Sequence, residues 1–156
     1  MTTTAFVLAL MYALIAQYHE QPAAWEDSYK TTAEAIANRC AAAPLPGGGA
    51  EWCEAVLVVQ AHQESRFNPE AVHDHGQGHG LYGVHEATLG RAVPDDADGQ
   101  TEAALELLRL SFRACSAQPL DERLAQFASG YCDQRRPLSR YRLHMAARLL
   151  RSTPAE

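Results

Sequence analysis

The segment from His62 to Val84, HQESRFNPEAVHDHGQGHGLYGV, concentrates side chains that can do chemistry. It contains four histidines and three acidic residues, together with five residues that are glycine or proline. Imidazole nitrogens are common ligands of zinc, copper and nickel, whereas a carboxylate beside a loop can act as a catalytic acid or base. The composition therefore leaves two interpretations, a histidine metal loop and a loop that presents one catalytic carboxylate.

The metal interpretation depends on His73, His75, His79 and His85, which lie within thirteen residues. Their spacing matches no helical H-E-x-x-H arrangement, and a glycine-rich loop holds ligands in place poorly. We therefore expect neither a metal nor another cofactor. A histidine-loop metal-binding protein is kept as an alternative.

The carboxylate interpretation depends on Glu64, at the end of the most apolar stretch, EWCEAVLVVQAHQES, residues 51–65. A helix that is apolar nearly all round belongs at the centre of a domain. Partial burial and the negative end of the helix dipole both disfavour the charged carboxylate, so such a glutamate can hold a proton and act as a general acid. The alternative is a solvated glutamate at a helix end. His62 points away from Glu64 in helical projection and is expected in the core or the cleft wall.

The elements that must position these residues are helices, because no segment alternates convincingly between apolar and polar residues. Glycine, proline and capping residues predict the bounds of the helices. Thr31 and Glu34 form a candidate capping box for a helix that ends near Ala42. Further helices are expected at 51–65, about 87–91, 101–115, 120–129 and 137–151, with Thr101 as a cap. The sequence predicts an all-α domain of about six helices around the central helix 51–65.

The first twenty residues contain about twelve apolar residues without a charge. This run is short for a membrane span, and no Lys or Arg precedes it as in a signal peptide. Residues 1–20 are therefore expected to be an N-terminal apolar helix or a signal-like segment, and residues 25–152 the domain. No stable membrane span is expected.

Four cysteines form two closely spaced pairs, 13 and 17 residues apart. We expect disulfides from Cys40 to Cys53 and from Cys115 to Cys132, each joining a helix end to a neighbouring helix. Loops of this size contribute about 3 kcal/mol per bond in the chain-entropy model. Such bonds indicate an oxidising compartment, and four buried thiols are the alternative.

The formal net charge is −6, and the basic residues are concentrated after residue 100. Nucleic-acid binding requires clustered positive charge, and the sequence has no basic run beyond Arg135 and Arg136. A nucleic-acid partner is therefore not expected.

Two segments carry a resemblance to a known family. ESRFNPEAV, a glycine loop and GLYGV resemble the lytic transglycosylase (SLT) domain of the lysozyme-like superfamily, whose pattern is E-S-x-F-x-P-x-A-x-S, a glycine loop and G-L-M-Q. The matching residues are Glu64, Ser65, Phe67, Pro69, Ala71, Gly80 and Leu81. LAQFASGYC, residues 124–132, resembles the later A-x-Y-N-A-G motif, with Phe127 at its tyrosine. The resemblance covers about residues 51–148.

This resemblance implies a lysozyme-like helical domain, as in goose-type lysozymes and lytic transglycosylases, that degrades the cell wall. Glu64 would be the single acid and base that cleaves the β-1,4 bond between N-acetylmuramic acid and N-acetylglucosamine in peptidoglycan. The expected product is a 1,6-anhydro sugar, as in a lytic transglycosylase, and a lysozyme-type muramidase is the related outcome. We expect a monomer that binds glycan strands and acts outside the cytoplasm, in the periplasm or cell wall, or is delivered there by a phage.

The residues around Glu64 are expected to bind substrate. They are Ser65, His73, Asp74, Leu81, Tyr82, Gly83 and Phe127. Asp74 is either a second carboxylate that positions water or an aspartate that hydrogen-bonds its own turn.

Three of these residues depart from the family pattern. His73 aligns with a serine, Gly83 with the glutamine, and Phe127 lacks the tyrosine hydroxyl, which Tyr82 or Tyr131 can supply instead. A catalytically weak or inactive peptidoglycan-binding relative is therefore the second alternative.

Overall fold

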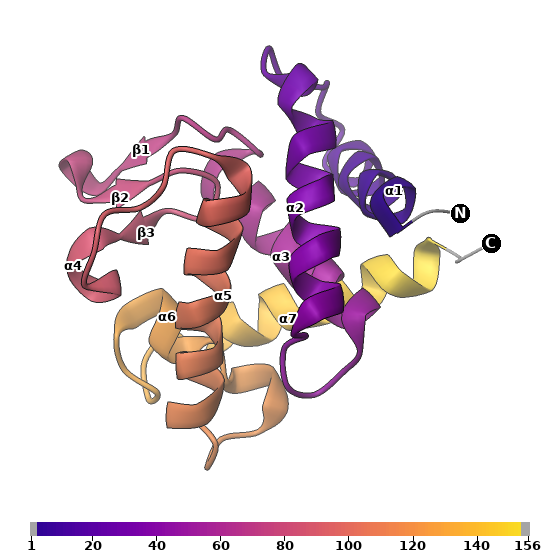
Figure 1. The fold of residues 1–156 in the computed structure, drawn as a ribbon. Coiled ribbons are helices and arrows are strands. Elements are labelled where there is room, and N and C mark those ends of the chain that lie inside the picture. The colour runs from indigo at the N-terminus through magenta and orange to yellow at the C-terminus, as the bar shows by residue number, and fades with distance from the viewer. Residues whose placement is uncertain (1–2, 154–156) are drawn as a thin grey trace.

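Helix α3, Ala50–Ser65, runs through the centre of the fold in a computed structural model that describes residues 3–153 (Figure 1). Every residue from Cys53 to His62 is buried. The helix packs against α1, Thr3–Gln17, α2, Tyr29–Ala42, and α7, Arg136–Ser152. The predicted central helix is therefore confirmed, and so is the mostly helical character of the chain.

The apolar N-terminal stretch forms α1, which lies against α2 and α3 (Figure 1). Its buried side chains are Phe6, Val7, Leu10, Met11, Leu14 and Ile15. Within residues 3–153, no helix is both long and apolar enough to cross a membrane.

The predicted starts of two helices are wrong. Helix α2 begins at Tyr29, so Thr31 lies inside it, and no side chain caps its first turn. Helix α5, Ala97–Ala114, begins four residues before the expected Thr101. Its cap is Asp96, whose carboxylate accepts a hydrogen bond from the Gly99 amide at 2.8 Å, as an N-cap aspartate commonly does.

The single helix predicted over 120–129 is also wrong, because it is divided into a 3₁₀ turn, η3, Leu120–Glu122, and α6, Ala125–Ser129. Two buried serines accept hydrogen bonds from backbone amides at the start of α6. Ser139 accepts a hydrogen bond from the Leu124 amide, and Ser111 accepts one from the Phe127 amide, both at 3.0 Å. Helix α6 ends at Gly130 as predicted, and α7 matches the expected last helix closely.

A small antiparallel sheet, which the sequence did not predict, follows α3. Its strands are β1, Val72–His73, β2, Gly78–His79, and β3, Val84–His85. The register pairs His73 with Gly78, and Gly78 with His85. Two-residue strands are too short to show an alternating pattern. A 3₁₀ turn, η2, Asp74–Gly76, lies between β1 and β2, and the sheet leads into α4, Glu86–Leu89.

Both expected disulfides are present, Cys40 to Cys53 and Cys115 to Cys132. The first joins α2 to α3, as predicted. The second joins the end of α5 to the loop after α6, so its second partner lies in a loop and not in a helix.

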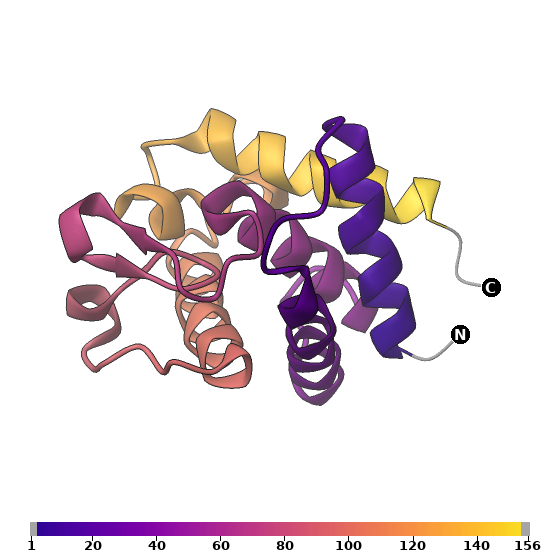
Figure 2. The ribbon, with the colours of Figure 1, turned by 90° about the horizontal axis from the view of Figure 1, so that it is seen from above.

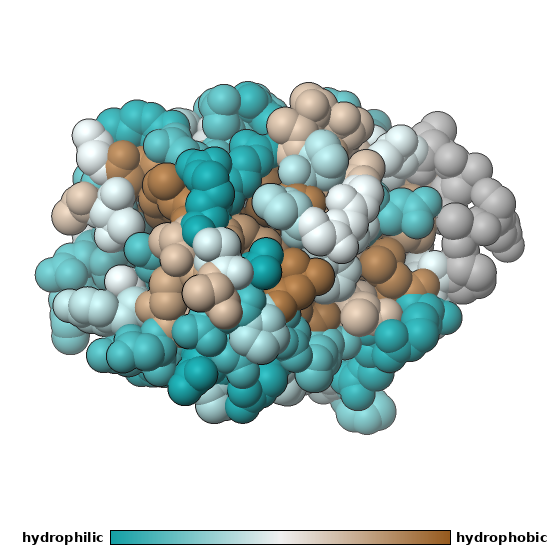
Figure 3. All heavy atoms as spheres, turned by 90° about the horizontal axis from the view of Figure 1, so that it is seen from below, coloured by the Kyte–Doolittle hydropathy of each residue, from teal (hydrophilic) through white to brown (hydrophobic). Residues whose placement is uncertain are grey.

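Two further views show how these elements are arranged. Seen from above, the sheet and α5 lie at one side of the molecule and α1 at the other (Figure 2). Seen from below, apolar residues form separate areas between hydrophilic ones (Figure 3).

The remaining short element is a 3₁₀ turn, η1, Glu26–Ser28, ahead of α2.

Candidate active site

A cleft of about 390 Å³ opens where α3, the small sheet and α6 meet. Its volume falls in the range of small-ligand sites, about 300–1,000 Å³. Glu64 comes from α3, and a second group of lining residues comes from the segment that contains the sheet: Asp74, Tyr82, Gly83, Val84, His85 and Thr88. The third group comes from α5 and α6: Leu107, Gln126, Phe127, Ala128, Ser129 and Gly130. The acidic side chains in this lining are Glu64 and Asp74.

Glu64 is partly exposed, and its carboxylate forms an ion pair with an arginine of α7. Its Oε1 atom lies 2.5 Å from Arg142 Nη1. The same guanidinium nitrogen donates to the buried Gln60 Oε1 at 2.6 Å. The positive guanidinium and the carboxylate attract each other at this distance. The sequence predicted burial and the helix dipole as the influences on Glu64, and it did not predict this ion pair.

The ion pair also distinguishes the two oxygens of Glu64. Oε1 faces Arg142, whereas Oε2 lies on the side of Gly83, 3.4 Å from the position that a Cβ atom would take there. A proton carried by the neutral acid would therefore sit on Oε2, because Oε1 already faces a positive charge.

The chain turns sharply directly after Glu64. Arg66 and Phe67 both have left-handed backbones, with φ of 55° and 63°. Such a conformation costs about 1–3 kcal/mol at a residue other than glycine, and the complete burial of the Phe67 side chain offsets part of that cost. Ser65 Oγ lies within hydrogen-bond distance of the Ala61 and Leu81 carbonyl oxygens. It ties the helix end to the glycine loop and does not line the cleft.

Gly83 and His73 stand beside Glu64, where the resemblance places a glutamine and a serine. A Cβ atom at Gly83 would lie 3.5 Å from His73 Cδ2, and its φ of +59° is left-handed. His73 Nε2 is buried and has no hydrogen-bond partner within residues 3–153. His73 does not belong to the cleft lining, whereas Gly83 does.

A second pair of titratable groups lies in the cleft. Asp74 Oδ2 is 2.7 Å from His85 Nε2. The Asp74 side chain is 65% exposed and the His85 side chain 36%, and a pair this exposed adds at most about 1 kcal/mol to stability. Asp74 and His75 both have left-handed backbones, which cost about 1–3 kcal/mol each. The stabilisation from the Asp74–His85 ion pair is therefore too small to offset the cost of these two backbone conformations.

Gln100 of α5 holds the glycine loop against the body of the protein. Its side chain accepts from the Leu81 amide at 2.9 Å and donates to the Pro69 carbonyl at 3.0 Å. A Cβ atom at Gly80 would lie only 2.4 Å from Gln100 Oε1, and the backbone there is left-handed with φ of +74°, so a side chain at this position would displace Gln100 and strain the turn. Leu81 itself is fully buried and contributes to the core rather than to the cleft.

Neither tyrosine considered as a substitute for the missing hydroxyl is bonded to Glu64. Tyr82 lines the cleft, but its hydroxyl lies 3.1 Å from Thr101 Oγ1. Thr101 in turn donates to the Ala97 carbonyl, so Tyr82 is the donor of that bond. Burial raises the pKa of the Tyr82 hydroxyl. Tyr131 is 62% exposed and lies outside the cleft lining.

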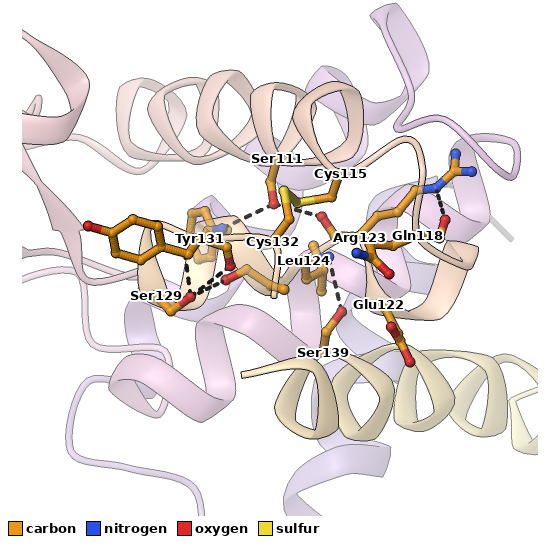
Figure 4. The surroundings of a disulfide bond; sticks show 12 residues. Ser111, Cys115, Gln118, Glu122, Arg123, Leu124, Ser129, Tyr131, Cys132 and Ser139 are labelled. Atoms are coloured by element: carbon orange, nitrogen blue, oxygen red, sulfur yellow. Dashed lines mark hydrogen bonds between the residues drawn. A yellow bond between two sulfur atoms is a disulfide. The ribbon is translucent and has the colours of Figure 1, made fainter. Parts of the chain in front are cut away.

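The α6 wall of the cleft is held by side chains from two long helices (Figure 4). Ser111 of α5 donates to the Arg123 carbonyl at 2.6 Å and accepts from the Phe127 amide. Ser139 of α7 donates to the Asp121 carbonyl at 2.8 Å. The Cys115–Cys132 disulfide fastens the loop that follows this wall. Phe127 is thereby fixed at the edge of the cleft.

The structure thus brings together Glu64, Asp74, Tyr82, Gly83 and Phe127 from the expected site residues. The other three expected substrate-binding residues, Ser65, His73 and Leu81, lie behind the lining.

The sequence did not predict Arg142 or Gln100 as part of the site, and it indicated His85 only as a metal ligand. Arg142 carried a signal, because it shares one helical stripe with the buried residues Met145, Ala146 and Leu149. A charged residue on an apolar stripe needs a partner. Gln100 carried no comparable signal, since it lies in a segment expected to be a loop.

His62, the first histidine of the opening segment, is buried and lies outside the cleft lining. Its Nε2 atom lies 2.9 Å from Glu20 Oε2, and burial lowers the pKa of His62 against the opposing effect of that bond. Among residues 3–153, no group of three or more histidine, cysteine or acidic side chains is arranged to hold a metal ion.

Comparison of the chain with protein-family models, with curated proteins and with solved structures finds no match.

Proposed function

We propose that this protein is a peptidoglycan-cleaving glycosidase with a lysozyme-like fold, and that Glu64 is its general acid and base. The observation that carries the proposal is the place of Glu64 at the end of the buried helix α3, with Oε2 directed toward Gly83 in a cleft of about 390 Å³. The ESRFNPEA motif supports it, because its serine and phenylalanine build the turn that follows the glutamate.

The proposed substrate is the glycan strand, at the β-1,4 bond between N-acetylmuramic acid and N-acetylglucosamine. Glu64 protonates the glycosidic oxygen, and Arg142 stabilises the carboxylate that this leaves behind. The same carboxylate then takes a proton from the attacking group. With the muramic acid's own 6-hydroxyl as that group, the product is a 1,6-anhydro sugar, as the family resemblance predicts. With water, the product has a reducing end.

Action outside the cytoplasm belongs to the same proposal. The two disulfides support it, because such bonds persist in oxidising compartments.

The test is the release of soluble muropeptides from purified cell walls by the wild type and by Glu64→Gln. We expect the variant to lose release by at least about 10²–10⁴-fold, the usual contribution of a general acid or base. The amide oxygen of glutamine can still accept from Arg142, so the fold should persist, as circular dichroism and the melting temperature will show. Undiminished release by this variant sinks the proposal.

Glu70→Gln is the matched control. Glu70 is exposed in the loop six residues after Glu64 and lies outside the cleft lining. It carries the same chemical change without touching the site, and we expect release at the wild-type rate.

Two alternatives predict different results in the same assay. A peptidoglycan-binding relative without activity is retained on sedimented walls while neither protein releases fragments. A metal-binding protein loses melting temperature or activity when a chelator is added.

A further inference from the structure

The Asp74–His85 pair forms a second chemical group in the cleft beside Glu64. Asp74 Oδ2 and His85 Nε2 are 2.7 Å apart, and both residues line the cleft that Glu64 lines. Glu64 comes from the C-terminal end of α3, whereas His85 comes from β3 and Asp74 from the 3₁₀ turn η2. A substrate lying in the cleft therefore has chemically active side chains from separate elements around it.

The register of the sheet explains how His85 reaches this position. His73, Gly78 and His85 are directly opposed across the three strands, and opposed residues point to the same face of a sheet. A Cβ atom at Gly78 would lie 3.2 Å from His73 Cβ and 3.3 Å from His85 Cδ2. The missing side chain at Gly78 therefore leaves room for the His85 ring on this face.

The partner of His85 fixes which ring nitrogen is basic. An ionised aspartate can only accept a hydrogen bond, so the proton of the neutral ring is on Nε2 and the lone pair is on Nδ1. Within residues 3–153, no hydrogen bond engages Nδ1 of His85. The ring is held in one tautomer, with its basic nitrogen free to accept a proton.

We propose that His85, oriented by Asp74, is the catalytic base that activates water, so that the protein cleaves glycan strands by hydrolysis. This inference rests on the proposed function. Glu64 gives its proton to the glycosidic oxygen as the bond from that oxygen to C1 of the sugar breaks. Water forms the new bond to C1 and loses its proton to His85 Nδ1, so that His85 replaces Glu64 as the base when water is the attacking group. The leaving sugar gains a hydroxyl, the other sugar becomes a reducing end, and one water is consumed.

Asp74 is a positioning residue in this step, because it acts through the imidazole. Its carboxylate holds the tautomer and stabilises the imidazolium that forms. Asp74 follows β1 in a left-handed conformation, with φ of 49°. The exposed ion pair does not offset the cost of this backbone conformation, whereas a role in orienting His85 accounts for it.

The test is mass spectrometry of cell-wall fragments released in ¹⁸O-labelled water and reduced at once with borohydride. Reducing ends become alditols, whereas anhydro ends do not react and carry no solvent oxygen. We expect the wild type to give reducing ends with one labelled oxygen. Anhydro ends alone from the wild type overturn the inference.

His85→Gln should slow release by about 10²–10⁴-fold, and the remaining products should shift toward anhydro ends. The 6-hydroxyl of muramic acid is part of the substrate and needs no bound water. It therefore attacks C1 in place of water when water is no longer activated. Asp74→Asn should shift the products in the same direction, and Asp74→Glu should restore the reducing ends. A merely structural role for the pair would leave the ratio of products unchanged.

His79→Gln is the matched control, because His79 lies on β2 in register with Val72 and Val84 and outside the cleft lining. It should leave both the rate and the products unchanged. If Glu64→Gln abolishes release while His85→Gln keeps the wild-type rate and products, only this inference fails. If Glu64→Gln releases fragments normally, the proposed function fails with it.

Discussion

Two of the walls of the cleft, α3 and the segment that contains the small sheet, are built in opposite ways. On one side, α3 is a regular helix whose residues 53–62 are all buried, so packing fixes Glu64. On the other side, the segment from Asn68 to His85 has two-residue strands, several glycines and the left-handed residues Asp74 and His75. Its shape depends on a few hydrogen bonds, especially those of Gln100. The α3 side therefore contributes most to the stability of the fold, whereas the other side carries Asp74 and His85 on a less tightly packed segment.

This division makes the cost of losing apolar atoms very different on the two sides. Leu57 in α3 is fully buried, whereas Val72 in β1 is 65% exposed. We expect Leu57→Ala to lower the free energy of unfolding by about 2–5 kcal/mol and Val72→Ala to change it by less than about 0.5 kcal/mol. Urea denaturation measures both. Similar losses for the two variants would break the comparison.

A buried carboxylate makes the α3 side sensitive to pH. Glu54 is fully buried, and neither of its oxygens has a hydrogen-bond partner within residues 3–153. Burial, with a smaller contribution from Glu51, raises the pKa of Glu54 from 4.5 to about 7. The unfolded chain loses this proton at lower pH than the folded protein does. Stability is therefore complete below the ordinary value and falls as pH rises through the folded value, by at most about 3 kcal/mol.

Glu54→Gln should remove this loss. In urea denaturation the variant should gain stability over the wild type at about pH 8, and much less at about pH 5. His62 acts in the opposite sense, because its lowered pKa makes its contribution present at high pH and lost as pH falls. A constant difference between wild type and variant across this pH range would show that Glu54 does not titrate as described.

The two disulfides separate stability from the shape of the cleft. They close loops of 13 and 17 residues, so replacing either pair by serine should cost about 3 kcal/mol. Only the Cys115–Cys132 bond fastens the loop after the α6 wall. We expect the Cys115→Ser, Cys132→Ser variant to lose muropeptide release, and the Cys40→Ser, Cys53→Ser variant to keep it, at a temperature at which both are still folded. Equal effects of the two variants on release would contradict this role.

The smallest expected effect concerns a single glycine beside Glu64. Gly83→Ala places a side chain on a left-handed backbone, which costs about 1–2 kcal/mol, and its Cβ atom meets Glu64 Oε2. Gly90 has a similar backbone, with open space around it. Gly90→Ala should therefore lower the melting temperature similarly while leaving release unchanged. If only Gly83→Ala slows release, the effect comes from the contact with Glu64 and not from backbone strain.

The contrast between the two sides also explains what the sequence could predict. The α3 helix, the helix end at Gly130 and both disulfide pairs follow from local patterns, because apolar runs, glycine and cysteine spacing leave direct traces in a sequence. Two helix starts were predicted wrongly, since Asp96 and not Thr101 caps α5 and no side chain caps α2.

The arrangement of the site was less predictable, because its contacts join residues far apart in the sequence. Arg142 meets Glu64 across 78 positions of the chain. Asp74 and His85 come together only through a sheet whose strands are too short to recognise from alternation. The position of Glu64 at a helix end was accessible from the sequence, and its partner was not.

The most direct measurement is an experimental structure of the Glu64→Gln variant with a peptidoglycan glycan fragment bound. We expect the sugar chain to lie in the cleft between α3, the small sheet and α6, with a β-1,4 glycosidic oxygen within about 3 Å of the side chain at position 64. A glycan bound elsewhere on the protein, or one whose glycosidic bonds all lie out of reach of position 64, would contradict it.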